Sequence, residues 1–234
     1  MARFCLLFFL FSFVLLSSAQ DKKFAQPDLP GDLLLDIGLN YWSNDRDTLS
    51  NFASKSLGVY YTRHFRISDK FSFNPAVGLG FEKYAFKKDY HYRNVDGIIR
   101  LDTLPSNFDK NKLAVTYLDI PLELRYYPKS TIEGEGFFVG AGVIGGLKMG
   151  AHSKIKYEDA VTRGKEKLRS NFGLRDVRYG LQFRIGWKGV HFFYKHYMSP
   201  VYKGKQDLVD RDLQPTGKRY NPTVSTFGIN FTGF

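Results

Sequence analysis

The alternation of apolar and polar residues in the stretch 176–197, DVRYGLQFRIGWKGVHFFYKHY, is the feature that most constrains the fold of this chain. Apolar side chains occupy every second position from Val177 to Trp187, with arginine, glycine and glutamine between them. Because side chains alternate faces along a β-strand, this pattern predicts a two-faced strand. Lys188-Gly189 predicts a tight turn, after which a second strand begins. The hairpin alone does not decide whether its apolar face enters a soluble core or faces lipid.

Eight segments show this alternation and are predicted to be strands: 33–42, 56–67, 71–86, 115–127, 136–150, 175–187, 190–199 and 223–232. Most are longer than the five or six residues usual in soluble sheets, and they suit the 9–11 residues of a tilted membrane-crossing strand. Pro75 and Pro121 lie inside two of them. Since proline donates no ladder hydrogen bond, we expect a bulge or a local break at each.

The connections between these segments alternate between long and short. The long ones are 43–55, 87–114, 151–174 and 200–222, and the short ones are 68–70, 128–135 and 188–189. A bacterial outer-membrane barrel has this asymmetry, with long loops outside and short turns and both termini on the periplasmic side. The chain is therefore predicted to be all-β, an eight-stranded antiparallel up-and-down transmembrane β-barrel.

The first residues, MARFCLLFFLFSFVLLSSAQ, are typical of a cleavable signal peptide. Arg3 precedes an apolar run that ends at Leu16, and small residues lead to a cut after Ala19. An N-terminal membrane anchor is the alternative, but the run is short against the roughly 20 residues that a spanning helix needs. We predict a signal peptide at 1–19, a short periplasmic leader at 20–30 and the barrel at 31–234.

Cleavage there would remove the one cysteine and leave a strongly basic chain. Without Arg3, 33 basic and 23 acidic residues remain, a net charge of +10. A chain without cysteine has no disulfide, no thiolate metal site and no cysteine nucleophile.

In such a barrel the apolar faces meet lipid, and the polar faces line a lumen barely wide enough for its own side chains. The predicted lumen polar cluster is Asp36, Glu82, Asp119, Glu123, Arg125, Arg178, Arg184 and Lys195. The same face carries Asn40, His64, Lys148 and Gln182. We interpret these residues as a paired filling that closes the lumen. A proton or solute pathway would use the same residues.

The chain ends in FGINFTGF, an amphipathic last strand with a terminal aromatic residue. Such an end resembles the signal read by the barrel-assembly machinery, a partner during biogenesis. Over residues 31–234 the chain looks like the outer-membrane β-barrel domain family, which includes porin-family and PorT-like proteins. The resemblance implies an integral multi-pass barrel in the outer membrane of a Gram-negative cell envelope. Some PorT-like members are linked to protein secretion, so an envelope or secretion assembly is a possible partner.

Little in the sequence points to catalysis. The candidates for a lipid-modifying enzyme at the rim are His152 with Ser153 and Glu158, and His196 with Ser199. In both sets the histidine and the serine have opposite strand parity, so their side chains are predicted to face opposite sides of the wall. The run GAGVIGG at 140–146 lies within a predicted strand, so we do not interpret it as a nucleotide-binding loop. We predict no catalytic residue, no cofactor and no metal.

The positive charge of the connections between the predicted strands indicates what surrounds the barrel. Residues 154–170 carry six basic and three acidic side chains, which suits outer-membrane lipid and lipopolysaccharide as partners. An exported barrel does not meet nucleic acid. We predict a non-enzymatic barrel that acts through its outer loops or as an accessory of an envelope assembly. The alternative is a narrow porin-like channel or transporter for small solutes.

Overall fold

The structure is a computed structural model, which describes residues 31–43, 49–86, 90–95, 98–103, 108–129, 136–158, 163–187, 189–204, 206–209 and 215–233. The predicted signal peptide (1–19) and leader (20–30) lie outside the described residues, as does Lys188 of the predicted turn. Gly189, the second residue of that turn, has a φ of +80°, a left-handed conformation that glycine adopts without a steric penalty.

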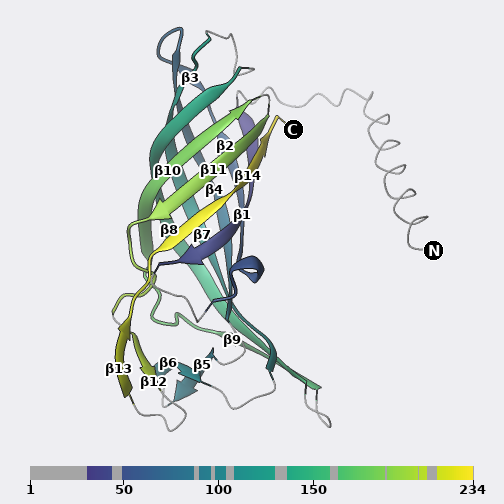
Figure 1. Cartoon of the computed structure of the whole chain (residues 1–234), viewed down its shortest axis with the longest axis vertical. Helices are drawn as coiled ribbons and strands as arrows, with labels where there is room; N and C mark the ends of the chain where they lie inside the picture. The colour runs from purple at the N-terminus through teal and green to yellow at the C-terminus, as the bar shows by residue number, and fades with distance from the viewer. Residues whose placement is uncertain are drawn as a thin grey trace, which may run out of the picture. The chain divides into compact units, whose positions relative to one another are not determined.

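Eight strands close into a barrel (Figure 1). They are β1 (Asp32–Trp42), β2 (Lys55–Thr62), β4 (Phe71–Phe86), β7 (Phe108–Tyr126), β8 (Phe138–Glu158), β10 (Val177–Trp187), β11 (Val190–Tyr197) and β14 (Val224–Thr232). Each pairs antiparallel with the next, and the β14–β1 pairing closes the ring. The predicted eight-stranded antiparallel barrel is confirmed.

Several long connections contain structure that the sequence pattern missed. β9 (Arg163–Arg169) extends the barrel wall by pairing with β8, and η1 (Asn51–Ala53) follows β1. A separate four-stranded sheet consists of β5 (Tyr90–Val95), β6 (Ile98–Thr103), β12 (Gln206–Val209) and β13 (Pro215–Tyr220). Its β6 and β12 come from two different connections and meet at Leu101 and Leu208. At the other end of the barrel, the short β3 (Phe65–Arg66) pairs with β4.

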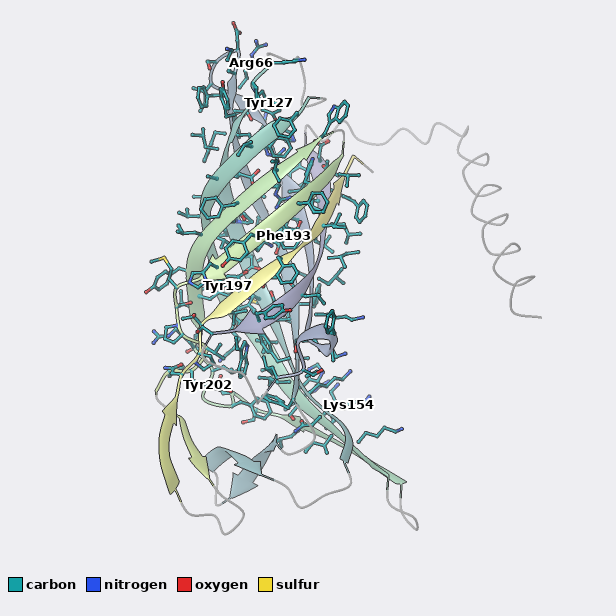
Figure 2. All side chains as sticks on the ribbon, viewed as in Figure 1. Arg66, Tyr127, Lys154, Phe193, Tyr197 and Tyr202 are labelled. Atoms are coloured by element: carbon teal, nitrogen blue, oxygen red, sulfur yellow. The ribbon has the colours of Figure 1, made fainter. Side chains whose placement is uncertain are left out.

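The outside of the barrel is apolar. On β10, for example, Val177, Leu181 and Phe183 are exposed, whereas the alternating residues between them are buried. Large exposed side chains of this kind occur on all eight barrel strands, and Figure 2 shows side chains standing out from the wall. A soluble monomer rarely exposes so large an apolar surface, whereas a membrane barrel presents it to lipid. Among the described residues, no helix has the length and apolar content to cross a membrane.

Several irregularities in strand pairing shape the wall. Pairing between β4 and β7 is interrupted between Pro75 and Gly78, opposite Pro121, without a change of register. A local break was expected at each proline, and a single gap in the pairing of β4 and β7 lies next to both of them. A true register shift occurs elsewhere, between β7 and β8, where Thr116 pairs with Gly150 and Tyr117 with Lys148. This bulge reverses the alternation of β8, so that residues 153 and 155 are buried beyond it.

The mouth at the end with the long connections is filled by a cluster of buried apolar side chains, which we call the outer hydrophobic cluster. It comprises Trp42, Leu49, Tyr84, Phe86, Leu113, Val115, Tyr117, Ile144, Phe172, Leu174, Tyr197, Val201, Tyr202 and Val224. Barrel strands supply most of these residues, and segments 171–174 and 201–202 close over them. Figure 2 shows Tyr202 at this end and Tyr127 at the opposite end.

Candidate functional site

The barrel interior holds all eight residues of the predicted lumen polar cluster. Each is at most 5% exposed: Asp36, Glu82, Asp119, Glu123, Arg125, Arg178, Arg184 and Lys195. The strands bring four carboxylates and four cations into one interior, so the formal charges balance. Uncompensated buried charges are costly, and pairing with hydrogen bonds is what makes such an interior tolerable.

Arg178 links the outer part of this network. Its Nε and Nη2 donate to the two carboxylate oxygens of Asp119 at 3.1 and 2.6 Å, and its Nη1 donates to Glu82 at 3.1 Å. The guanidinium also lies 3.8 Å from the ring centre of Tyr117 and 4.2 Å from that of Tyr197. Two carboxylates and two aromatic faces therefore hold this cation directly beneath the outer hydrophobic cluster.

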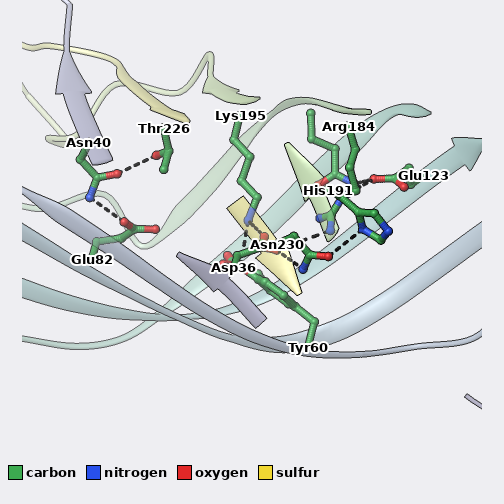
Figure 3. Close-up of polar contacts among 12 residues, drawn as sticks. Asp36, Asn40, Tyr60, Glu82, Glu123, Arg184, His191, Lys195, Thr226 and Asn230 are labelled. Atoms are coloured by element: carbon green, nitrogen blue, oxygen red, sulfur yellow. Dashed lines mark hydrogen bonds and ion pairs between the residues drawn. The ribbon is translucent and has the colours of Figure 1, made fainter. Parts of the chain in front are cut away.

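Asp36 is the centre of the middle part (Figure 3). Lys195 Nζ donates to it at 2.7 Å and Asn230 Nδ2 at 2.6 Å, and Arg184 Nη1 lies 3.5 Å away. Lys195 also donates to the hydroxyl of Tyr60 at 3.1 Å. That hydroxyl in turn donates to Asp119 at 3.4 Å, which connects the middle and outer parts.

Glu123 is the centre of the part nearest the short turns. It accepts from Arg125 Nε at 2.5 Å, and from Arg184 Nε and Gln182 Nε2 at 3.1 Å each. Arg125 lies over the ring of Phe138, 4.3 Å from its centre. The same ring makes an edge contact with His191 at 4.7 Å between ring centres. Aromatic contacts thus close the network at both ends.

Glycines in the wall give these charged groups room. A Cβ at Gly146 would overlap Oδ1 of Asp119 and lie 3.0 Å from Cγ of Arg178. A Cβ at Gly140 would lie 3.0 Å from Oε1 of Glu123. The glycine-rich run 140–146 therefore provides space for two ion pairs in a narrow barrel.

Sequence reasoning missed several members of the network. Tyr60, His191, Thr226 and Asn230 all make buried hydrogen bonds in the interior. Strand parity could have found them, because each lies at an inward position of its strand. Asn40, which shares the predicted face, donates to Glu82 at 2.7 Å and accepts from Thr226 at 2.6 Å.

Two other residues of the predicted face lie at the barrel ends, outside this network. Lys148, next to the bulge, donates to Asp176 at 2.9 Å and to the carbonyl of Leu174 at 2.9 Å. His64 is exposed near the short turns, with Nε2 2.8 Å from Asp32.

A small cavity adjoins the outer part of the network. A cavity of about 10 Å³, the room of one water molecule, lies between Arg178, Arg175, Tyr84, Tyr117 and Tyr197. Here the side chains themselves fill the lumen, as expected for an eight-stranded barrel.

Among the described side chains, the rim residues considered for catalysis have different faces or different partners. Ser153 is buried on the inner face, whereas its neighbour His152 is on the outer face. His196 Nδ1 lies 2.9 Å from the hydroxyl of Ser225, and Ser199 is buried and accepts from the amide of Tyr179 at 3.1 Å. The side chain of Glu158 lies outside the described side chains. Within the described part of the chain, no three His, Cys, Asp or Glu side chains gather as metal ligands would.

A closed eight-stranded barrel with an apolar outside and a charged, paired inside defines an integral outer-membrane β-barrel protein. The chain belongs to the outer membrane protein beta-barrel domain family, whose model matches residues 35–200. The protein is therefore an integral protein of the outer membrane. No curated protein sequence matches the chain significantly.

Solved structures that match the chain include Ail, the attachment invasion locus protein of Yersinia pestis. At 10% identity the match covers 87% of this chain and 97% of that one, with a TM-score of 0.36. A structure of Ail in complex with the heparin analogue sucrose octasulfate matches at 9% identity and a TM-score of 0.32, covering 88% and 100% of the two chains. A triple mutant of the Rhodopseudomonas blastica porin matches at 11% identity and a TM-score of 0.19, covering 87% and 98%.

Proposed function

We propose that the protein is a closed, non-enzymatic outer-membrane barrel that anchors a folded outer region, and that this outer region carries its function. The observation that carries the proposal is the filled interior. Four carboxylates pair with four cations there, and the outer hydrophobic cluster covers them. A barrel with a filled interior is better suited to holding an exposed outer region than to conducting solutes.

The outer region has the features of such a surface. β7 and β8 are 19 and 21 residues long, about twice what is needed to cross the bilayer, so they continue beyond it. Two connections at this end also fold into the four-stranded sheet of β5, β6, β12 and β13. A barrel with no role outside the membrane would not need the long β7 and β8 or the four-stranded sheet. The partner would be a component of an envelope assembly, and a protein-secretion assembly is one candidate from the resemblance to PorT-like proteins.

Planar-bilayer recording separates this proposal from the alternative of a narrow solute channel. We expect the purified protein to give no stable conductance steps over the range of voltages that the bilayer tolerates. Reproducible steps from the folded protein would favour the channel instead. The variant Tyr202→Ala, which removes part of the outer hydrophobic cluster but leaves the charged network intact, is the positive control for detecting a leak.

Two cellular measurements address the remaining roles. We expect lipid A mass spectra to be the same with and without the gene, and a changed acylation pattern would favour an enzyme at the rim. Deletion of the gene should impair export of secreted proteins if the partner is a secretion assembly. Normal export in the deletion strain would remove that partner and leave other envelope assemblies.

A further inference from the structure

The small cavity at the outer end of the barrel carries polar groups that the ion-pair network does not use. Arg175, just before β10, lines it together with Tyr197 and Ser199. Tyr197 is the last residue of β11 and is labelled in Figure 2. Apolar side chains, among them Val201 and Val224, form other parts of the lining. A few polar atoms therefore meet in a partly apolar space, which is the usual character of a binding site for a small ligand.

Two of these polar atoms have no hydrogen-bond partner among the described residues. They are Nε of Arg175 and the hydroxyl oxygen of Tyr197, and both atoms are buried. The Tyr197 residue as a whole is only 2% exposed. A buried polar atom without a partner is costly, so native proteins nearly always satisfy such atoms, with a bound water or ion where the protein offers no partner. A ligand in the cavity would satisfy both.

The polar groups of the lining have protons to donate. Arg175 Nε can only donate. Ser199 Oγ already accepts from the amide of Tyr179 at 3.1 Å, which leaves its own proton for another acceptor. The hydroxyl of Tyr197 rotates freely enough to donate as well. A water molecule would need acceptors for its own two protons, whereas an anion needs none.

The charges around the cavity also favour an anion. The eight charges of the lumen polar cluster balance, and Arg175 adds one positive charge beside them. Carboxylates in this part of the barrel already have cations of their own, since Asp119 pairs with Arg178 and Asp176 pairs with two lysines. Hydrogen bonds from a guanidinium to an anion are among the strong ones in proteins.

The size of the cavity limits the anion to a single atom. Its volume of about 10 Å³ is the room of one water molecule, so polyatomic anions such as sulfate or phosphate are too large. We propose that this cavity is a binding site for a monatomic halide ion, with chloride as the natural ligand, held by Arg175, Tyr197 and Ser199.

A bound halide would strengthen the closed mouth of the barrel. Arg175 precedes β10, whereas Ser199 follows β11, and the amide of Arg175 already donates to the carbonyl of Val201 at 2.9 Å. The ion would add a second link between the same two segments, beneath the outer hydrophobic cluster. This role is separate from the proposed role of the outer region, because the ion lies inside the barrel and meets no partner.

Thermal unfolding of the detergent-folded protein, with sodium gluconate replaced stepwise by sodium chloride at constant ionic strength, tests the inference. A ligand that binds only the folded state raises the apparent Tm. We expect chloride to raise the Tm of the wild type. In Tyr197→Phe the chloride concentration needed for the same rise should increase about tenfold, the factor that one hydrogen bond to a charged group provides. Tyr194→Phe, which removes a hydroxyl from the outward face of the same strand, is the matched control and should respond as the wild type does.

The variant Tyr197→Phe also keeps the test independent of folding. In gluconate it should be at least as stable as the wild type, because the lost hydroxyl has no partner in the described part of the chain and the ring beside Arg178 remains. A wild-type Tm that does not change with chloride would overturn the proposal. The same chloride response in Tyr197→Phe as in the wild type would also overturn it, because the rise would then be a general salt effect.

Bromide locates the ion directly. In crystals of the wild type grown in sodium bromide, we expect an anomalous difference peak in the cavity between Arg175 and Tyr197. In crystals of Tyr197→Phe this peak should be weaker or lost. Density for a water molecule at this place, without an anomalous peak, would show that the cavity is a hydration site and would overturn the proposal.

Discussion

Arg178 and Asp119 form a two-point ion pair inside the barrel, with Nε to Oδ1 at 3.1 Å and Nη2 to Oδ2 at 2.6 Å. The two residues are 59 positions apart in the chain, and strands β7 and β10 carry them to the same level of the lumen. Glu82 and Tyr60 extend this pair towards Asn40 and Lys195. The interior is thus one connected network, and the loss of one member should affect its neighbours.

The variant Arg178→Leu should be strongly destabilised. It leaves the carboxylates of Asp119 and Glu82 buried without their shared cation, and removing one partner of a buried pair costs about 3–5 kcal/mol. Urea unfolding in lipid vesicles, followed by tryptophan fluorescence, measures the change. Adding Asp119→Leu should recover part of the loss because one orphaned charge is removed. A single variant within about 1 kcal/mol of the wild type would contradict the view that this pair matters.

Gly146→Ala should be destabilising even though it adds only a methyl group. The new Cβ would overlap Oδ1 of Asp119, which Arg178 holds in place, so the pair must shift. Overpacking of this kind costs about 1–3 kcal/mol. Gly145→Ala is the matched control: a Cβ there meets nothing within 4 Å. Equal unfolding free energies for the two variants would show that the inner wall is not tightly packed.

Much of the barrel was predictable because alternation is a direct consequence of having one face in lipid and one in the lumen. The segment predicted at 71–86 is β4 (Phe71–Phe86) without any change. β7 and β8 are longer than predicted, beginning at Phe108 and ending at Glu158 respectively. At the bulge between Lys148 and Gly150 the inward and outward positions of β8 exchange. The alternation that begins at Phe138 therefore does not continue beyond the bulge. Bulges leave no reliable mark in a single sequence.

The interior was predictable as a set of residues but not as a set of contacts. Parity along each strand indicates that Asp36 and Arg184 share the inner side, since both lie between outward apolar residues. Their ion pair joins positions 148 apart, and it depends on the stagger of the strands around the closed barrel. The sheet formed by β6 and β12 was hidden for the same reason, because it joins two distant connections.

Asp176, just before β10, should stay ionised to unusually low pH. Hydrogen bonds from Lys203 and then Lys148 lower its pKa from 3.8 to about 2. A lowered folded-state pKa means that these contacts stabilise the fold fully above the unfolded value and are lost as pH falls through about 2. The carboxyl ¹³C shift of Asp176 should therefore titrate near pH 2. In Lys203→Gln the midpoint should move up towards 3.8, and an unchanged midpoint would contradict the assignment of that lysine.

The lipid-facing surface gives the sharpest test of membrane topology. Phe183 is 49% exposed near the middle of β10, whereas Phe52, in η1 beyond the end of β1, is 83% exposed. An arginine on the lipid face near the bilayer centre costs about 2–4 kcal/mol, and the cost falls towards zero near the interface. Phe183→Arg should therefore fold poorly into vesicles, with the heat-modifiable gel band of the folded barrel much reduced. Phe52→Arg, the matched control, should fold nearly as well as the wild type. If both variants folded equally well, the apolar side of the wall would not be facing hydrocarbon, and the barrel would have to be interpreted as a soluble one.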